Sequence, residues 1–114
     1  MKLLIIFNKD INISAEKICV HVGHSNRNIT TQLFCNKKTH KSTWANWMNN
    51  DFKSVILRDK ITDNLITKIK DTKIWYEIYD AGLDGTFKAG TILGYAFLVP
   101  KDNDTFKRLR TLKF

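Results

Sequence analysis

Hydrophobic residues occur along this chain in short blocks separated by polar stretches, and the blocks predict its strands and helices. Residues 3–7 are apolar at every position, a pattern typical of a strand that is covered on both faces. A helix is predicted over residues 14–28, because Ser14 is a favourable N-cap residue. Ile18 and Val22 then share one face of this helix, which we expect to be buried.

The next stretch, residues 26–41, is polar, basic and rich in Asn and Thr, with apolar residues only in its middle. We interpret it as a loop or an irregular helix. A second helix is predicted to follow, capped by Ser42 or Thr43. Three large residues at helical spacing are expected to pack this helix on the core: Trp44, Trp47 and Met48.

The second half of the chain continues the alternation of strands and helices. Strands are predicted at residues 53–57, 74–79 and 91–99, and Pro100 ends the last one. Residues 80–90 form a glycine-containing turn region. A helix capped by Thr62 or Asp63 is expected to bury Leu65, Ile66 and Ile69. A short basic helix starting at Asn103 or Asp104 is expected to bury Phe106 and Leu109.

This order of elements indicates an α/β fold. Strands interleaved with helices imply βαβ units and a largely parallel sheet with helices on both faces. The short connection between the last two predicted strands suits an antiparallel pair, so we expect a four-stranded mixed sheet in a three-layer sandwich. A chain of 114 residues is long enough for one core, which predicts a single domain over residues 1–114.

The chain is strongly basic, with a formal net charge of +8 and a pI near 9.6. Such a balance attracts polyanions, and a basic face for RNA is one interpretation. The alternative is a lysine-rich composition without a specific partner, since the charges form no single run. The basic residues that stand out are Lys37, Lys38, Lys41, Arg58, Lys60, Lys107, Arg108, Arg110 and Lys113.

Candidate chemistry gathers where strands end. Lys17, His21 and His24 share one face of the first predicted helix, and Asp80 directly follows the third predicted strand. Because ligands bind outside the carboxyl ends of strands in open α/β sheets, Lys17 and Asp80 are expected to meet at one edge. A solvated polar face and a structural ion pair are the competing interpretations.

Neither a metal site nor a membrane segment is predicted. Cys19 and His21 project roughly 200° apart on a helix, so only His21 and His24 could ligate together. The apolar run at the N-terminus is too short for the core of a signal peptide, and no segment approaches the roughly 20 apolar residues that span a bilayer. We expect a cytoplasmic chain whose two cysteines stay reduced.

Four segments in order resemble the archaeal and eukaryotic type of peptidyl-tRNA hydrolase. Residues 3–14 followed by Lys17 resemble the first strand and helix start of that family, and residues 74–82 resemble its strand ending in Asp-Ala-Gly. Trp47 falls at a family-like tryptophan shortly before a strand. Leu112, Lys113 and Phe114 stand where the family ends in Leu-Lys-Leu. The family's fold, a four-stranded mixed sheet between helices, agrees with the pattern.

This resemblance implies a hydrolase that cleaves the ester between a peptidyl group and tRNA. It implies Lys17, Asp80 and His21 as catalytic residues, with Lys17 at the oxyanion or the terminal phosphate and Asp80 orienting water or Lys17. The expected substrate-binding residues are His24, Asp84 and Thr86. The implied partner is tRNA, a homodimer is compatible with the resemblance, and no metal or organic cofactor is required.

The chain departs from the family pattern at several site positions. His21 replaces a Gln, Gly23 replaces a Ser, and Leu83-Asp84 follows Asp-Ala-Gly where the family has a basic or apolar residue and then Thr. Thr86 could fill that role only across a two-residue insertion. Two alternatives therefore stay open: an RNA- or protein-binding module of the same fold, and an enzyme that uses these side chains on a small molecule.

Overall fold

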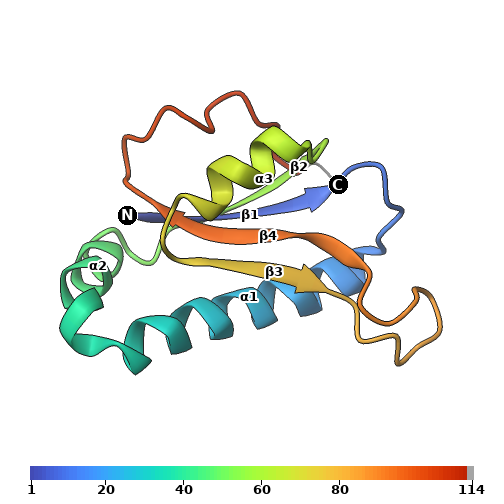
Figure 1. The fold of residues 1–114 in the computed structure, drawn as a ribbon, viewed down its shortest axis with the longest axis horizontal. Helices are drawn as coiled ribbons and strands as arrows, with labels where there is room; N and C mark the ends of the chain where they lie inside the picture. The colour runs from blue at the N-terminus through green and yellow to red at the C-terminus, as the bar shows by residue number, and fades with distance from the viewer. Residues whose placement is uncertain (113–114) are drawn as a thin grey trace.

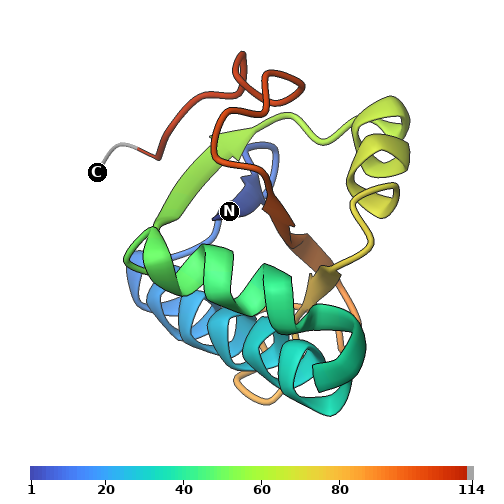
Figure 2. The same ribbon diagram turned by 90° about the vertical axis from the view of Figure 1, so that its left-hand side faces the viewer.

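The computed structural model describes residues 1–112, apart from the side chains of residues 37–39. Its strands are β1 (Lys2–Asn8), β2 (Ser54–Asp59), β3 (Trp75–Tyr79) and β4 (Ile92–Val99), and its helices are α1 (Ala15–Cys35), α2 (Lys37–Asn49) and α3 (Asp63–Lys70). The four strands form one sheet, with α1 and α2 on one face and α3 on the other (Figure 1, Figure 2). The predicted α/β fold with helices on both faces of a four-stranded sheet is confirmed.

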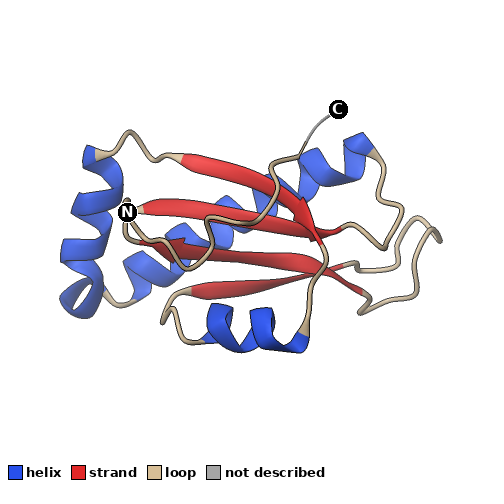
Figure 3. Ribbon diagram, turned by 90° about the horizontal axis from the view of Figure 1, so that it is seen from above, coloured by secondary structure: helices blue, strands red, loops and turns tan. Residues whose placement is uncertain are grey.

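The sheet is mixed and has the strand order β2-β1-β4-β3 (Figure 3). β1 pairs in parallel with β2, whereas β4 pairs antiparallel with both β1 and β3. Three strands therefore run in one direction, but only one of the three pairings is parallel. The predicted mixed sheet and the antiparallel pairing of the last two strands are confirmed. The intermediate expectation of largely parallel pairing was wrong, because β4 lies between β1 and β3 and is antiparallel to both.

β1 is buried on both faces, as its uninterrupted apolar sequence predicted. Leu3, Ile5 and Phe7 face α1 and α2. Leu4 and Ile6 face α3. Each buried side chain of this size contributes about 1.5–3 kcal/mol relative to an exposed one, so this strand anchors both cores.

Gly94 in β4 allows the two central strands to pair closely. A Cβ at this position would lie 1.9 Å from the carbonyl oxygen of Ile6, far inside any real contact distance. A side chain here would push β4 away from β1, so the sequence requires glycine.

α1 extends well beyond the predicted end near residue 28. Ser14 caps it as expected, since its Oγ accepts a hydrogen bond from the Lys17 amide at 3.2 Å. The helix continues to Cys35 because Ile29 and Leu33 prolong the buried stripe of its first half. The interpretation of residues 26–41 as a loop or irregular helix was wrong: tertiary packing outweighs their low helix propensity.

α2 begins at Lys37, after Asn36, so the predicted caps Ser42 and Thr43 lie inside the helix. The backbone of Lys37, Lys38 and Lys41 is thus helical. Trp47 is buried as expected, and its indole Nε1 donates to the Lys53 carbonyl at 3.1 Å. Trp44 is half-buried, but Met48 is 45% exposed, so its assignment to the core was wrong.

α3 matches its prediction, whereas the C-terminal segment does not. Thr62 Oγ1 accepts a hydrogen bond from the Leu65 amide at 3.1 Å, and Ile69 is fully buried. Leu65, Ile66 and Leu109 are partly buried beside it. The short helix expected from Asn103 or Asp104 is wrong, because residues 101–110 form turns. Asn103 Oδ1 caps one of these turns at the Thr105 amide. Phe106 still packs on Phe97.

None of the helices within residues 1–112 is long and apolar enough to cross a membrane.

Candidate active site

The candidate site lies at the edge of the sheet where β1, β2 and β3 all end. Asp80 directly follows β3, and Lys17 lies in the first turn of α1, which follows β1. β4 lies between β1 and β3 but runs the other way, so its N-terminal end separates the two segments. This is the edge where open α/β sheets bind their ligands.

Lys17 and Asp80 form an ion pair across this edge. Lys17 Nζ donates to Asp80 Oδ1 at 2.7 Å, and the two side chains are 13% and 5% exposed. The two residues are 63 positions apart in sequence, and their predicted meeting is confirmed. Ser14 sets the start of α1 and thereby fixes the turn from which Lys17 extends.

The backbone around Asp80 holds its carboxylate in place. Asp80 Oδ2 accepts a hydrogen bond from the Gly82 amide at 2.8 Å, and the Asp80 amide donates to the Thr91 carbonyl at 2.9 Å. Gly82 has a φ of 76°, and a Cβ there would lie 2.9 Å from the Ala89 nitrogen. Only glycine therefore allows this turn to close behind the carboxylate.

Two further side chains from the turn region enclose the Lys17 ammonium. Asp84 Oδ2 accepts from Lys17 Nζ at 2.8 Å, and the ammonium lies 5.2 Å from the centroid of the Phe87 ring, within cation–π range. One cation thus faces two carboxylates, Asp80 and Asp84, which gives this group a formal charge of −1. Asp84 is 55% exposed and lies on the solvent side.

Hydrogen bonds set the charge states in this group. The hydrogen bonds to Asp80 and then Asp84 raise the pKa of Lys17 above its usual value. The hydrogen bond from Lys17 lowers the pKa of Asp80, against the opposing effect of burial, and lowers the pKa of Asp84 to about 2. All three groups are therefore charged at neutral pH.

His21 lies one turn after Lys17 on α1 and is buried. Its Nε2 is 3.9 Å from Asp80 Oδ1, too far for a direct hydrogen bond, and its buried Nδ1 has no hydrogen-bond partner within residues 1–112. Burial lowers the pKa of His21 below its usual value, and the neighbouring His24 adds to this effect. The imidazole is thus neutral at pH 7 and able to accept a proton.

A cavity of about 310 Å³ opens beside this group. Lys17, His21, His24, Asp80 and Asp84 all line it. Two exposed apolar side chains, Val20 and Leu83, form part of its wall and are 53% and 93% exposed. The arrangement offers a fixed cation, a neutral base and an apolar surface at one opening, a combination that can polarise a carbonyl group and activate water for attack on it.

The structure brings together five of the six predicted site residues. Lys17, His21, His24, Asp80 and Asp84 share the cavity, but Thr86 is exposed and absent from its lining. The Thr86 amide instead donates to Asp84 Oδ1 at 3.0 Å, so Thr86 shapes the turn that carries Asp84.

Sequence reasoning missed Phe87, Leu83 and Val20. A large apolar residue inside a polar turn, such as Phe87, was the available signal for the first of these. Of the motif at the C-terminus, Lys113 and Phe114 lie outside the described residues.

Within the part of the chain that the structure describes, no group of three or more His, Cys, Asp or Glu side chains could hold a metal ion. Comparison of the sequence with models of protein families and with curated proteins finds no match. The geometry of the cavity and the chemistry of its side chains are therefore the grounds for a functional proposal.

Proposed function

We propose that this protein hydrolyses the ester bond between a peptidyl, or N-blocked aminoacyl, group and the 3′ ribose of tRNA. The observation that supports this proposal most is the ion pair of Lys17 and Asp80 in a cavity at the edge where three strands end. The resemblance to peptidyl-tRNA hydrolases implies a functional Lys and Asp at these two positions.

In this proposal, Lys17 stabilises the negative charge that develops on the carbonyl oxygen of the ester. Asp80 holds the ammonium in position and orients the attacking water. Neutral His21 accepts a proton of that water as its oxygen bonds to the carbonyl carbon. His21 then returns this proton to the ribose oxygen, which leaves as a hydroxyl when its bond to the carbonyl carbon breaks. The Asp84 carboxylate contacts the same ammonium, so it moves aside or shares Lys17 when the substrate binds.

The net charge of +8 supports a polyanionic partner. Exposed cations at or near the edge that carries the cavity include Lys9 after β1, Lys60 after β2, and Arg110, whose amide donates to Asp59 Oδ2 at 3.0 Å. We infer that they contact the phosphates of tRNA. The proposal places the protein in the cytoplasm, in translation and the rescue of stalled ribosomes, and a homodimer stays a prediction.

A second function, tRNA binding without efficient hydrolysis, has one observation in its favour. Lys17 is only 13% exposed and its ammonium is bound by two carboxylates, so the cation is not open to an incoming oxyanion in this arrangement. A domain that used only its basic surface would not need to free this lysine.

Hydrolysis and binding of the same substrate separate the two functions. N-acetylated aminoacyl-tRNA is incubated with the purified protein, and release of the N-acetyl amino acid is measured beside tRNA binding by filter retention. The proposed hydrolase releases the amino acid with multiple turnovers. Firm binding without release above the background rate would favour the binding module, and the absence of both would overturn both functions.

A further inference from the structure

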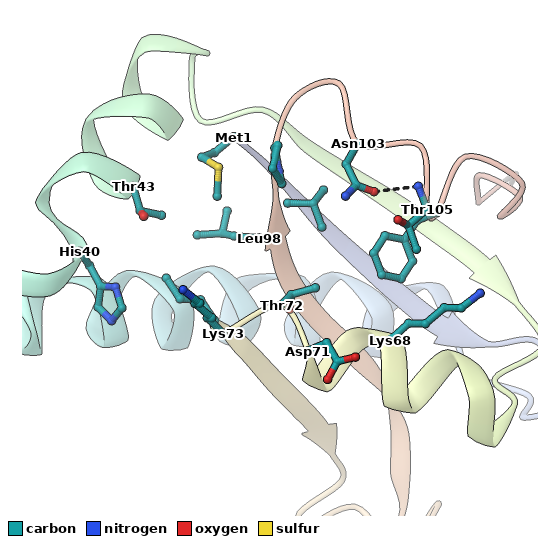
Figure 4. A pocket seen from close by; sticks show the side chains of 14 residues that line it. Met1, His40, Thr43, Lys68, Asp71, Thr72, Lys73, Leu98, Asn103 and Thr105 are labelled. Carbon is teal, nitrogen blue, oxygen red and sulfur yellow. Dashed lines mark hydrogen bonds between the residues drawn. The ribbon is translucent and has the colours of Figure 1, made fainter.

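A second, larger pocket lies at the opposite end of the sheet from the candidate active site. It has a volume of about 570 Å³, within the range of about 300–1,000 Å³ that is typical of small-molecule sites. It opens where β1 and β3 begin and β4 ends, between α2 and the segment after β4 (Figure 4). None of its lining residues lines the cavity around Lys17.

The base of this pocket is apolar. Ile74, Leu98, Val99 and Phe106 line it, and each of them is at least nine-tenths buried. These side chains are packed in the two hydrophobic cores, so the apolar base of the pocket exists before any ligand binds. An apolar body would be favoured here over water.

The polar side chains at the rim are two lysines, three threonines, one histidine, one asparagine and one aspartate. Lys73 lies on one side of Leu98 and Thr72, and Lys68 lies on the other side (Figure 4). Within the described residues, neither ammonium group makes a hydrogen bond or an ion pair. Asp71 is the one carboxylate among the described lining residues, so two lysines outnumber it.

Asn103 adds a neutral donor to this rim. Its Oδ1 accepts a hydrogen bond from the Thr105 amide at 2.9 Å (Figure 4). Its amide nitrogen is left without a partner among the described residues and can donate to a ligand.

Lys73 occupies a backbone conformation that favours glycine. Its φ is 50°, in the tight turn where the Thr72 amide and hydroxyl both donate to the Ile69 carbonyl. A non-glycine residue in this region is strained, and such strain clusters at functional sites. Lys73 lies at the rim of the pocket, so its replacement by glycine would relieve this strain and remove the ammonium group.

We propose that this pocket binds a small amphipathic anion, with its apolar body on Leu98, Val99 and Phe106. Its carboxylate or phosphate head group is attracted by the ammonium groups of Lys68 and Lys73. This inference is independent of the proposed hydrolysis, because it uses neither the cavity around Lys17 nor its side chains.

A titration of the ¹⁵N-labelled protein tests the site and the head group together. Octanoate, octyl phosphate and neutral 1-octanol are added separately, and amide shifts are followed by NMR. At least one anion is expected to give saturable shifts at residues 72–74, 98–99 and 103–106, with an affinity at least tenfold above that of 1-octanol. Octanoate alone identifies a carboxylate ligand, and octyl phosphate alone identifies a phosphate. Shifts from neither anion, or equal binding of 1-octanol, would overturn the proposal.

Variants of the two lysines test the rim without unfolding the protein. Lys73→Gly relieves the backbone strain, so it stays folded while losing the ammonium, and Lys68→Ala changes an exposed helix position. Each is expected to weaken binding of the anion by about three- to fivefold, the upper range for one exposed charge interaction. Lys101→Ala, an exposed lysine next to Pro100 and outside the lining, should stay within about twofold of wild type. Wild-type affinity in both rim variants would overturn the proposal.

Discussion

The two carboxylates that bind the Lys17 ammonium differ in how firmly the chain holds them. Asp80 is 5% exposed and also bound by the Gly82 amide, whereas Asp84 is 55% exposed in a turn. A buried, anchored carboxylate suits a positioning role in catalysis, and an exposed one suits a group that moves when substrate binds. Substitution of each by its isosteric amide separates these roles.

Asp80→Asn is expected to lower the turnover of N-acetylated aminoacyl-tRNA by roughly 10²-fold, because the ammonium loses its fixed anionic partner. Asp84→Asn is expected to retain turnover, since the substitution leaves Lys17 on Asp80 and frees one side of the ammonium. Steady-state hydrolysis by both variants, beside circular dichroism to verify folding, provides the measurement. Equal losses in the two variants would mean that both carboxylates serve the same purpose.

His21 makes the stability of the protein depend on pH. Because burial lowers the pKa of His21 in the folded state, the unfolded chain binds more protons than the folded one just below pH 6.5. The free energy of unfolding should therefore fall as the pH drops below about 6.5. In His21→Gln this fall should be smaller. Urea unfolding of both proteins between pH 7.5 and 5 measures the difference, and identical profiles would contradict the inferred burial of a neutral imidazole.

The meeting of Lys17 and Asp80 could be predicted from sequence because it follows from topology. Asp80 directly follows β3, and Lys17 lies at the start of the helix that follows β1. Because β1 and β3 run in the same direction, both residues lie at the same edge of the sheet. The positions of Phe87 and Thr86 could not be predicted. They depend on the path of the turn between β3 and β4. This path is determined by Gly82 and by hydrogen bonds from backbone amides to the Asp80 and Asp84 carboxylates.

At the scale of elements, the start of α1 determines where Lys17 can reach. Ser14→Ala removes the hydrogen bond to the Lys17 amide and is expected to cost about 1 kcal/mol of stability. Thr62→Ala removes the equivalent bond at α3 and serves as a matched control. Both should lower the free energy of unfolding in urea by similar amounts, but only Ser14→Ala should also reduce hydrolysis. A similar loss of hydrolysis in Thr62→Ala would point to general destabilisation.

The helices also show which local signals were sufficient. Ser14 and Thr62 were identified because a cap is a hydrogen bond within three residues of sequence. The second half of α1 was missed because it is rich in Asn and Thr, and its helical state depends on packing of Ile29 and Leu33 in the core beside the sheet. The opposite error occurred after Pro100, where Asn103 caps a turn that no helix follows.

At the scale of the whole molecule, the two ends of the sheet carry different groups of cations. Lys9, Lys60 and Arg110 lie at or near the edge with the candidate active site. Lys2, Lys53 and Lys101 lie at the other end, at the beginning of β1, before β2 and after β4. Three basic residues chosen at each end provide a test of position with the change in charge held constant.

Reversal of charge at Lys9, Lys60 and Arg110 to Glu should weaken tRNA binding more than the same change at Lys2, Lys53 and Lys101. The slope of log affinity against log salt should become shallower by about 1 for each phosphate that the variant no longer neutralises. Binding at several salt concentrations measures both effects. Equal effects of the two triple variants would mean that the net charge acts without a preferred face.

The role of Lys17 needs a control for folding, because its removal leaves Asp80 buried without a cation. Lys17→Arg retains the charge and should preserve the fold, although its planar group differs in geometry from an ammonium. Circular dichroism and tRNA binding of this variant and of Lys17→Ala establish whether both proteins are folded before their kinetics are compared.

The most direct test of the proposed function is the turnover number of Lys17→Ala on N-acetylated aminoacyl-tRNA. If Lys17 stabilises the transition state, turnover should fall by roughly 10²-fold or more relative to wild type, the scale expected for the loss of one well-placed stabilising charge. Affinity for tRNA should change much less, since one cation is a small part of the basic surface. Wild-type turnover in a folded Lys17→Ala protein would contradict the account.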